Sequence, residues 1–254
     1  MIIDTHSHIY LPEFDRDRAE MIARAENEDV ELILMPAIDS GTHLTMLETE
    51  KGFDKKCMAM MGLHPCSVKE GYKAELRILT EYFENRQFVA VGETGLDFYW
   101  DRTFTKEQYD SFKIQIGLAL QNDIPVVIHS RESIDACIKV VSENQKGDLK
   151  GIFHCFSGNL EQANQIIDLG FYLGIGGVIT FKNSGLDKVM ADIDMKNVVL
   201  ETDAPYLAPV PFRGKRNECS YLKYVVEKLS EVKNLSKEEI KNITTENARK
   251  LFSL

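Results

Sequence analysis

The sequence lacks a long apolar segment, a pair of closely spaced cysteines and any repeated or low-complexity tract. No run reaches the roughly 18 apolar residues of a membrane-spanning helix, and the N-terminus has neither the basic region nor the apolar stretch of a signal peptide. The five cysteines are odd in number and include no C-x-x-C pair. This pattern favours reduced thiols over a disulfide framework or a cysteine-based zinc site. We therefore expect a soluble, cytoplasmic protein with no membrane partner.

Positive charge is also scarce. The sequence has 30 Lys and Arg residues against 40 Asp and Glu residues, which gives a net charge of -10. This balance argues against a protein that coats nucleic acid or an anionic membrane through bulk charge. It remains compatible with a local basic patch and with a site that collects cations. The hydrophobic content of 44% allows a substantial core, and 254 residues is an ordinary length for one α/β barrel. We expect a single domain over residues 1–254, a monomer and no obligate protein partner.

Short apolar runs alternate along the chain with longer amphipathic stretches. The runs are MIID (1–4), VELILMPA (30–37), CMAMMGLHP (57–65), FVAVGETG (88–95), IPVVIHS (124–130), GIFHCFS (151–157), FYLGIGGVI (171–179) and NVVLETD (197–203). Between them, residues 105–122 and 159–170 repeat apolar side chains at helical spacing. Apolar strands that alternate with helices predict a parallel sheet buried on both faces. Eight strands fit a closed (β/α)8 barrel of the TIM type, with a doubly wound open sheet as the alternative.

The C-terminal region predicts helix. Ser236 with Glu239 forms a capping-box signature that opens a helix through SKEEIKNI. The end of the chain, TTENARKLFSL, is typical of a final helix that packs Ala248, Leu251 and Phe252 onto the barrel. We expect this region to have a structural role.

Polar side chains follow the apolar runs, at the edge where an α/β barrel builds its active site. They are His6, His8, His64, Glu93, His129, His154, Glu201 and Asp203. Of the six histidines, only His43 lies elsewhere. A single histidine at such a place is more often structural than a metal ligand. Together on one rim, these side chains favour a metal site, and His6 and His8 point to a common side because they are two residues apart in a strand.

The candidate donors are numerous enough for more than one cation. Four or more imidazoles plus carboxylates exceed what a single catalytic ion with an open position needs. We expect His6, His8 and Asp203 to hold one divalent cation, His129 and His154 to hold a second, and Glu93 to bridge the two. Such a pair, about 3.5–4 Å apart, activates water and clamps an oxyanion. Nitrogen-rich ligation suits zinc, manganese or a related metal, whereas magnesium prefers oxygen.

Seven motifs occur in order over essentially the whole chain: DTHSH, GLHP, GETGLDFYWD, PVVIHSRE, FHCFSG, LETDAPYLAPVPFRGKRNE and TTENARKLF. In these motifs the sequence resembles the TatD family of metal-dependent deoxyribonucleases. The resemblance implies a TIM-like barrel, a divalent-metal site and hydrolysis of nucleic-acid phosphodiesters, commonly from the 3′ end. Position by position it also implies the ligands His6, His8, Glu93, His129, His154 and Asp203. One departure is Cys219, which stands where the family usually has a proline that would favour a helix start.

Three of the polar residues that follow the apolar runs are also candidates for catalytic roles. Asp203 is the candidate general base, since a carboxylate beside the metal and its water can take the proton of that water. The alternative for an acid at this place is a helix N-cap. We expect Glu201 to orient a ligand or the water. His64 is expected to contact a phosphate or the leaving group, with a hydrogen-bonded rim residue fixed by Pro65 as the alternative.

Cations concentrate in the loops after the predicted strands. The candidate phosphate contacts are Arg131, Lys182, Arg213, Lys215 and Arg216, of which Arg213 is favoured because it lies nearest the last metal-bearing strand. A solvated loop is the alternative for any one of them. Tyr99 and Trp100 can stack on a base, although a lone tryptophan is more commonly a loop anchor buried against the barrel.

The leading functional hypothesis is a metal-dependent nuclease with two divalent cations (zinc, manganese or magnesium) and DNA, or else RNA, as its substrate. The alternative is another amidohydrolase-type enzyme that cleaves a small amide, lactone or phosphoester. A non-catalytic metal-binding protein is the third hypothesis. The cationic loops favour the nuclease, because a small neutral substrate has no need of them.

Overall fold

A computed structural model describes residues 1–254 and contains all eight predicted strands. Each strand is parallel to its neighbours. The strands are β1 (Ile2–Asp4), β2 (Val30–Pro36), β3 (Cys57–Met60), β4 (Val91–Asp97), β5 (Val126–Arg131), β6 (Gly151–Phe153), β7 (Tyr172–Ile175) and β8 (Val198–Leu200).

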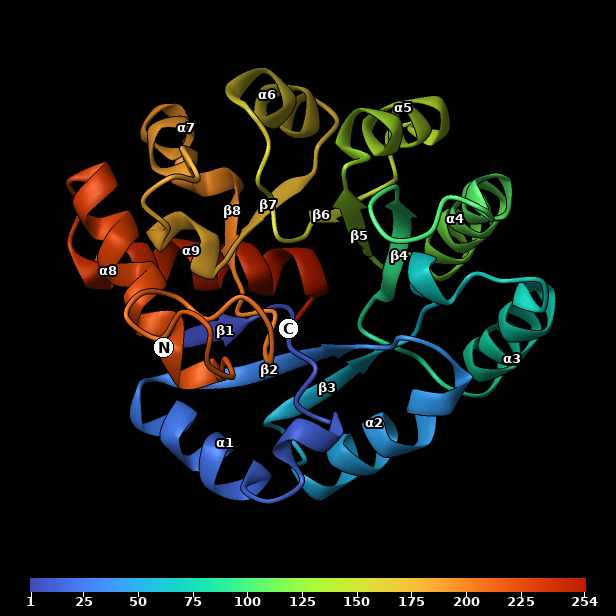
Figure 1. The fold of residues 1–254 in the computed structure, drawn as a ribbon, viewed down its shortest axis with the longest axis horizontal. Coiled ribbons are helices and arrows are strands. Elements are labelled where there is room, and N and C mark those ends of the chain that lie inside the picture. Colours follow the sequence, from blue (N-terminus) through green and yellow to red (C-terminus); the bar gives the residue numbers. More distant parts are fainter.

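Helices follow the strands and surround them in sequence order from α1 to α8 (Figure 1). They are α1 (Arg18–Asn27), α2 (Ser40–Gly52), α3 (Tyr72–Asn85), α4 (Thr105–Asn122), α5 (Ile134–Asn144), α6 (Leu160–Asp168), α7 (Leu186–Asp192), α8 (Leu222–Lys233) and α9 (Lys237–Phe252). Short 3-10 helices are η1 (Pro12–Phe14), η2 (Pro65–Ser67), η3 (Gly177–Thr180), η4 (Met195–Asn197) and η5 (Cys219–Tyr221). None of the helices combines the length and the apolar character that a membrane crossing requires.

The sheet closes into the predicted barrel, so the open-sheet alternative is wrong. Strands β1–β3 and β4–β8 form two ladders. A parallel bridge between Met61 and Val91 joins the ladders on one side. On the other side, the Thr5 N–H donates to the carbonyl of Leu200 at 2.9 Å. This second junction places the residues after β1 beside those after β8.

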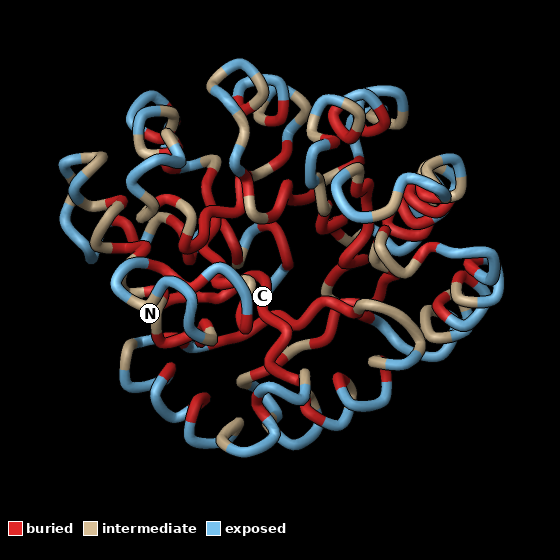
Figure 2. Tube along the Cα trace, in the orientation of Figure 1, coloured by how far each residue is buried: buried red, intermediate tan, exposed pale blue.

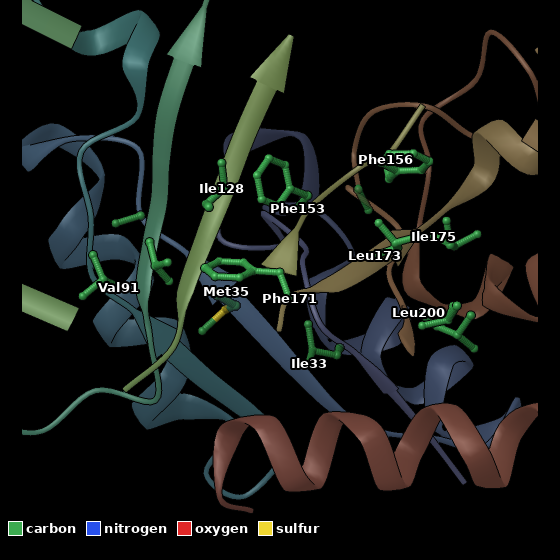
Figure 3. Close-up of a cluster of buried hydrophobic side chains, with 14 of the residues drawn as sticks. Ile33, Met35, Val91, Ile128, Phe153, Phe156, Phe171, Leu173, Ile175 and Leu200 are labelled. Carbon is green, nitrogen blue, oxygen red and sulfur yellow. The ribbon is translucent and has the colours of Figure 1, made fainter. Parts of the chain in front are cut away.

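Apolar residues fill both faces of the barrel wall, which explains the nearly continuous apolar runs. Ile3, Leu34, Val127 and Val199 belong to one buried cluster, and their sequence neighbours lie in a second, larger cluster between strands and helices. This alternation follows the two-residue period of a strand. Figure 3 shows part of the larger cluster, and Figure 2 shows the buried strands inside a ring whose outer helix surfaces are exposed.

The predicted helix signals are confirmed. Helix α4 spans residues 105–122, and α6 ends just before Gly170, which has a positive φ of 82°. The capping box of Ser236 and Glu239 opens α9, which continues without a break to Phe252. Its Ala248, Leu251 and Phe252 pack into the smaller cluster. Helix α9 therefore supports the barrel, as expected for a structural element.

Candidate metal centre

Five segments distant in the sequence bring the predicted donors together. His6 and His8 follow β1, Glu93 and His129 lie within β4 and β5, and His154 and Asp203 follow β6 and β8. The closed barrel is what joins the first and last segments, because the Asp203 N–H donates to the His6 carbonyl at 2.9 Å. His43, in contrast, is buried on α2 and packs edge-on against Tyr82.

One group of donor atoms gathers around the first histidine pair. Nε2 of His6 and Nε2 of His8 are 3.3 Å apart. Oε2 of Glu93 lies 3.1 Å from the His6 nitrogen and 3.6 Å from the His8 nitrogen. Oδ1 of Asp203 is 3.7 Å from each of the two nitrogens. Two nitrogens and two carboxylate oxygens thus converge on one point.

A second group gathers on the other oxygen of the same glutamate. Oε1 of Glu93 is 2.8 Å from Nδ1 of His129 and 2.8 Å from Nε2 of His154. The imidazoles of His154 and His6 are stacked with their centroids 3.8 Å apart, so the two groups are adjacent. Glu93 therefore faces one donor group with each carboxylate oxygen, which is the arrangement that a bridging ligand requires.

These residues fit divalent cations by their chemistry as well as by their convergence. The donor atoms of His6, His8 and Asp203 all lie within 4.8 Å of one another, as do those of His6, Glu93 and His154. Burial lowers the pKa of His6 well below its ordinary value, so its ring is neutral, the form that binds a metal. Burial alone would raise the pKa of Glu93, but the surrounding imidazoles hold it well below its usual range. Burial alone would lower the pKa of His129 and His154, but the adjacent carboxylates raise it, so cation binding to these two rings is coupled to the loss of their protons.

Tyr10 fixes the tautomer of His8. The Tyr10 hydroxyl donates to the carbonyl of Pro36 at 2.7 Å, and its oxygen lies 3.0 Å from Nδ1 of His8. Because the hydroxyl proton is already used, Nδ1 of His8 must be the donor in this pair. Nε2 of His8 is then left with its lone pair facing the donor group. Nothing in the sequence marks Tyr10 for this role except its two-residue spacing from His8.

Asp97 fixes His129 in a similar way and is a second residue that sequence reasoning did not assign. Its Oδ2 is 2.8 Å from Nε2 of His129. Burial would raise the pKa of Asp97, but the hydrogen bond with His129 holds it below its usual range. An ionised carboxylate can only accept, so Nε2 donates its proton to Asp97, and Nδ1, which faces Glu93 at 2.8 Å, is the nitrogen that would give up its proton to bind a cation. The detectable signal was an acid four residues after Glu93, at the end of the same strand.

Replacement of Asp97 with asparagine is expected to weaken cation binding by roughly 10- to 100-fold, the usual cost of losing a carboxylate behind a metal-bound imidazole. Competition with a chromophoric chelator measures this affinity directly. Asp101→Asn is the matched control, since Asp101 is a neighbouring acid that pairs with Lys69 away from the donors. Equal affinity for the wild type and Asp97→Asn would show that His129 does not depend on this carboxylate.

His64 reaches the same centre as a hydrogen-bond donor. Its Nδ1 accepts the N–H of Cys66 at 3.0 Å and thereby caps η2. The proton of the neutral ring therefore lies on Nε2, which is 3.5 Å from Oε1 of Glu93. A protonated nitrogen cannot bind a metal, but it can donate to a substrate oxygen. The N-capping role also agrees with the predicted fixing of His64 by the turn at Pro65.

Glu201 lies behind His154. Its Oε1 accepts the N–H of Cys155 at 2.5 Å and is 3.4 Å from Nδ1 of His154. Its Oε2 has no hydrogen-bond partner and lies over Gly174, where a Cβ would come within 2.4 Å of this oxygen. The carboxylate is thus placed to orient an imidazole, and it is remote from the open side of the centre.

Asp203 is the most accessible carboxylate of the centre, with 14% of its side chain exposed. Burial raises its pKa to about 7. Asp4, by contrast, is completely buried below the centre, where its Oδ2 accepts the hydroxyl proton of Thr202 at 2.6 Å. Asp4 therefore ties β1 to the residues after β8, and it does not contact the His6 imidazole.

Four of the five candidate phosphate contacts are exposed cations: Arg131, the last residue of β5, and Lys182, Arg213 and Lys215 in loops after the strands. Arg213 stands over the ring of Phe181 at 4.0 Å, which places it beside the chain that follows β7. Arg216 differs from the expectation. Its guanidinium pairs with both carboxylate oxygens of Asp17, at 2.7 and 2.8 Å. Arg216 holds this loop against the start of α1 and is the least available of the five cations.

Cys219 does not prevent a helix start at the position of the family proline. It is the first residue of η5, which runs into α8. The side chain is buried, and its Sγ lies 3.4 Å from Oγ of Ser7. The thiol therefore packs directly beneath the segment that carries His6 and His8.

Known proteins resemble this chain in sequence and in fold. The family described as TatD related DNase matches residues 3–253. The chain is 38% identical over 255 residues to the uncharacterized metal-dependent hydrolase YabD of Bacillus subtilis, with 100% of both chains covered. Among solved structures, YjjV of Escherichia coli, a TatD homolog, aligns with a TM-score of 0.94 and 30% identity over 100% of this chain and 98% of its own. A TatD family hydrolase of Entamoeba histolytica aligns with a TM-score of 0.85 and 23% identity, over 98% and 97% of the two chains, and supports the fold alone.

Proposed function

Because the chain belongs to the TatD-related DNase family and is a metal-dependent hydrolase like its relatives, we propose that it cleaves phosphodiester bonds of DNA as an exonuclease from the 3′ end. The observation that carries the proposal is the placement of Glu93, whose two carboxylate oxygens each face a separate group of donors. This is the pattern of a hydrolase that uses two cations on one phosphate. The exposed cations on the same rim support a polyanionic substrate.

Two divalent cations, zinc, manganese or magnesium, would occupy the centre. His6, His8 and Asp203 would hold the first, His129 and His154 the second, and Glu93 would bridge them. When bound, such cations supply charge neutralisation at the phosphoryl oxygens and activation of water. The excess of imidazole over carboxylate favours zinc or manganese over magnesium.

The protein's own side chains then provide proton transfer and orientation. The Asp203 carboxylate takes the proton of the attacking water and returns it to the leaving oxygen. The Nε2–H of His64 donates to the phosphate or to that leaving oxygen as negative charge develops on it. Glu201 orients the ring of His154, and Tyr10 and Asp97 keep His8 and His129 in the tautomers that the centre needs.

Phosphates outside the centre would be bound by the exposed cations Arg131, Lys182, Arg213 and Lys215. Arg213 and Arg131 have the strongest cases, because each guanidinium forms no ion pair and lies over an aromatic ring, that of Phe181 for Arg213 and that of Tyr99 for Arg131. An arginine in this state can bind a phosphate without first breaking an internal contact.

Arg213→Ala tests this substrate assignment. If the guanidinium binds one phosphate of a single strand, its removal is expected to reduce the slope of log K against log salt by about 0.7. Hydrolysis of a small activated phosphodiester should change much less, since such a substrate reaches the centre without the outer cations. Binding of labelled single-stranded DNA over a salt series measures the slope. Arg77→Ala, on the exposed surface of α3, is the control and should leave the slope unchanged.

A wild-type protein whose binding of DNA and RNA shows no salt dependence would contradict the nuclease proposal. That result would favour the amidohydrolase-type alternative, in which a small amide, lactone or phosphoester binds the same centre. RNA binding and cleavage equal to those of DNA would retain the phosphodiesterase chemistry and overturn the restriction to DNA.

A further inference from the structure

Two neighbouring aromatic side chains are exposed beside the metal centre. Tyr99 and Trp100 follow β4 and are 49% and 67% exposed. Their rings meet edge to face with centroids 4.9 Å apart. The alternative of a buried loop anchor is therefore wrong for Trp100. Large aromatic rings left in solvent at the edge of a site are typical of binding surfaces.

Arg131 completes this surface from the adjacent strand. Its guanidinium carbon lies 3.9 Å from the centroid of the Tyr99 ring and 5.2 Å from that of Trp100. The register of β4 and β5 produces this contact, because Asp97 pairs with Arg131 and the Phe98 N–H donates to the Arg131 carbonyl at 3.0 Å. Arg131 forms no ion pair, so its charge is available to an anion. We call Tyr99, Trp100 and Arg131 the aromatic platform.

A single carboxylate ties the platform to the metal centre. Oδ1 of Asp97 accepts the backbone N–H groups of Tyr99 and Trp100 at 2.9 and 3.0 Å. Oδ2 of the same residue contacts the ring of His129 at 2.8 Å. The start of the aromatic loop and the candidate ligand His129 are thus held in one fixed relation.

We propose that the aromatic platform is a nucleobase subsite, where a base next to the scissile phosphate stacks on Trp100 or Tyr99 while Arg131 contacts its backbone. This inference rests on the proposed function. A flat ring in solvent and an unpaired guanidinium match the two chemical parts of a nucleotide, its base and its phosphate. The base must be unpaired to stack on a side chain, so the platform favours single-stranded ends over intact duplex. Such a preference suits an enzyme that works from a strand terminus.

Trp100 offers a direct reporter, because it is the only tryptophan of the chain. The full-length protein carrying Asp203→Asn, which prevents turnover, is titrated with a single-stranded thymidine oligonucleotide. We expect the tryptophan fluorescence to be quenched with the same Kd that fluorescence anisotropy of the labelled oligonucleotide gives. On the same background, Trp100→Ala and Tyr99→Ala should each weaken binding roughly 5- to 150-fold, the range typical for removal of a side chain that stacks on a base. Trp100→Phe should retain most of the affinity.

Leu44→Ala is the matched control, since Leu44 is an equally exposed apolar residue on the outer helix α2 and its truncation should leave Kd unchanged. Circular dichroism verifies that each variant is folded. If the parent binds no oligonucleotide in the anisotropy experiment, the proposed function fails. If it binds the oligonucleotide while the tryptophan fluorescence stays constant and Trp100→Ala binds equally well, the platform is overturned and the nuclease proposal stands.

Discussion

Replacement of Glu93 with alanine is expected to remove both cations and abolish hydrolysis while the barrel stays folded. Each carboxylate oxygen serves a different donor group, with Oε2 3.1 Å from Nε2 of His6 and Oε1 2.8 Å from Nε2 of His154. Loss of this one side chain therefore removes a ligand from both positions and the negative charge between them. The barrel should persist because the backbone hydrogen bonds at this position, such as the donation of the Glu93 N–H to Ala37 at 3.2 Å, do not involve the side chain.

Metal analysis and circular dichroism on one preparation check this expectation. Glu143→Ala, which changes an exposed glutamate on α5, serves as the control and should retain the full metal content and activity. Retention of two metal equivalents by folded Glu93→Ala protein would remove Glu93 as the bridge. Retention of one equivalent would show that its two oxygens are not equally important to the two cation positions.

The fold was predictable because both faces of each strand are buried. The apolar runs could be recognised without knowledge of their partners, and alternation with helices then implied a parallel sheet. The convergence of His6 with Asp203 followed from the same reasoning, since the first and last strands must be neighbours in a closed barrel. The main difference between the predicted and the observed strands is at β4. The predicted run covers residues 88–95, whereas β4 begins at Val91, so Glu93 lies within the strand and Asp97 marks its end.

The residues that orient the candidate ligands were not predictable from periodicity. Tyr10 is identified only once its hydroxyl is seen between Pro36 and His8, and the role of Asp97 depends on the register of β4 with β5. Arg216 illustrates the opposite problem. Its place in a cationic loop favoured a phosphate contact, but a partner 199 residues away in the sequence, Asp17, takes its guanidinium. Local sequence reports charge and spacing, whereas these pairings arise from tertiary structure.

The exposure of Trp100 could not be predicted from the sequence either, because a lone tryptophan is more often buried than exposed to solvent. Its exposure follows from the short turn in which Asp97 accepts the N–H groups of Tyr99 and Trp100. That turn opens the loop that precedes α4, which begins at Thr105. The same carboxylate therefore accounts for two features that spacing alone could not predict, the loop conformation and the orientation of His129.

The exchange of Asp203 for asparagine is expected to lower kcat by roughly 100- to 10,000-fold, the usual contribution of a general base, while the protein retains its metal. The amide oxygen of asparagine can occupy the place of Oδ1, which lies 3.7 Å from Nε2 of both His6 and His8. It cannot accept the proton of the attacking water, because an amide is not basic at neutral pH. Metal analysis and turnover of an activated phosphodiester, both on one preparation, separate these two properties.

Asp54→Asn is the control for this experiment, since Asp54 is an exposed acid in the turn before β3, at the opposite end of the strands from the centre. It should match the wild type in both measurements. Loss of metal from Asp203→Asn would make Asp203 an essential ligand and leave its role as a base without support.

Near-native kcat with metal retained would require another proton acceptor. Glu201 is the next candidate, but its carboxylate is fully buried behind His154 and cannot reach an attacking water without a rearrangement of Cys155, whose N–H it accepts. Asp203 is thus the only carboxylate of the centre that combines proximity to the donor group with access from solvent, and the asparagine variant tests that combination directly.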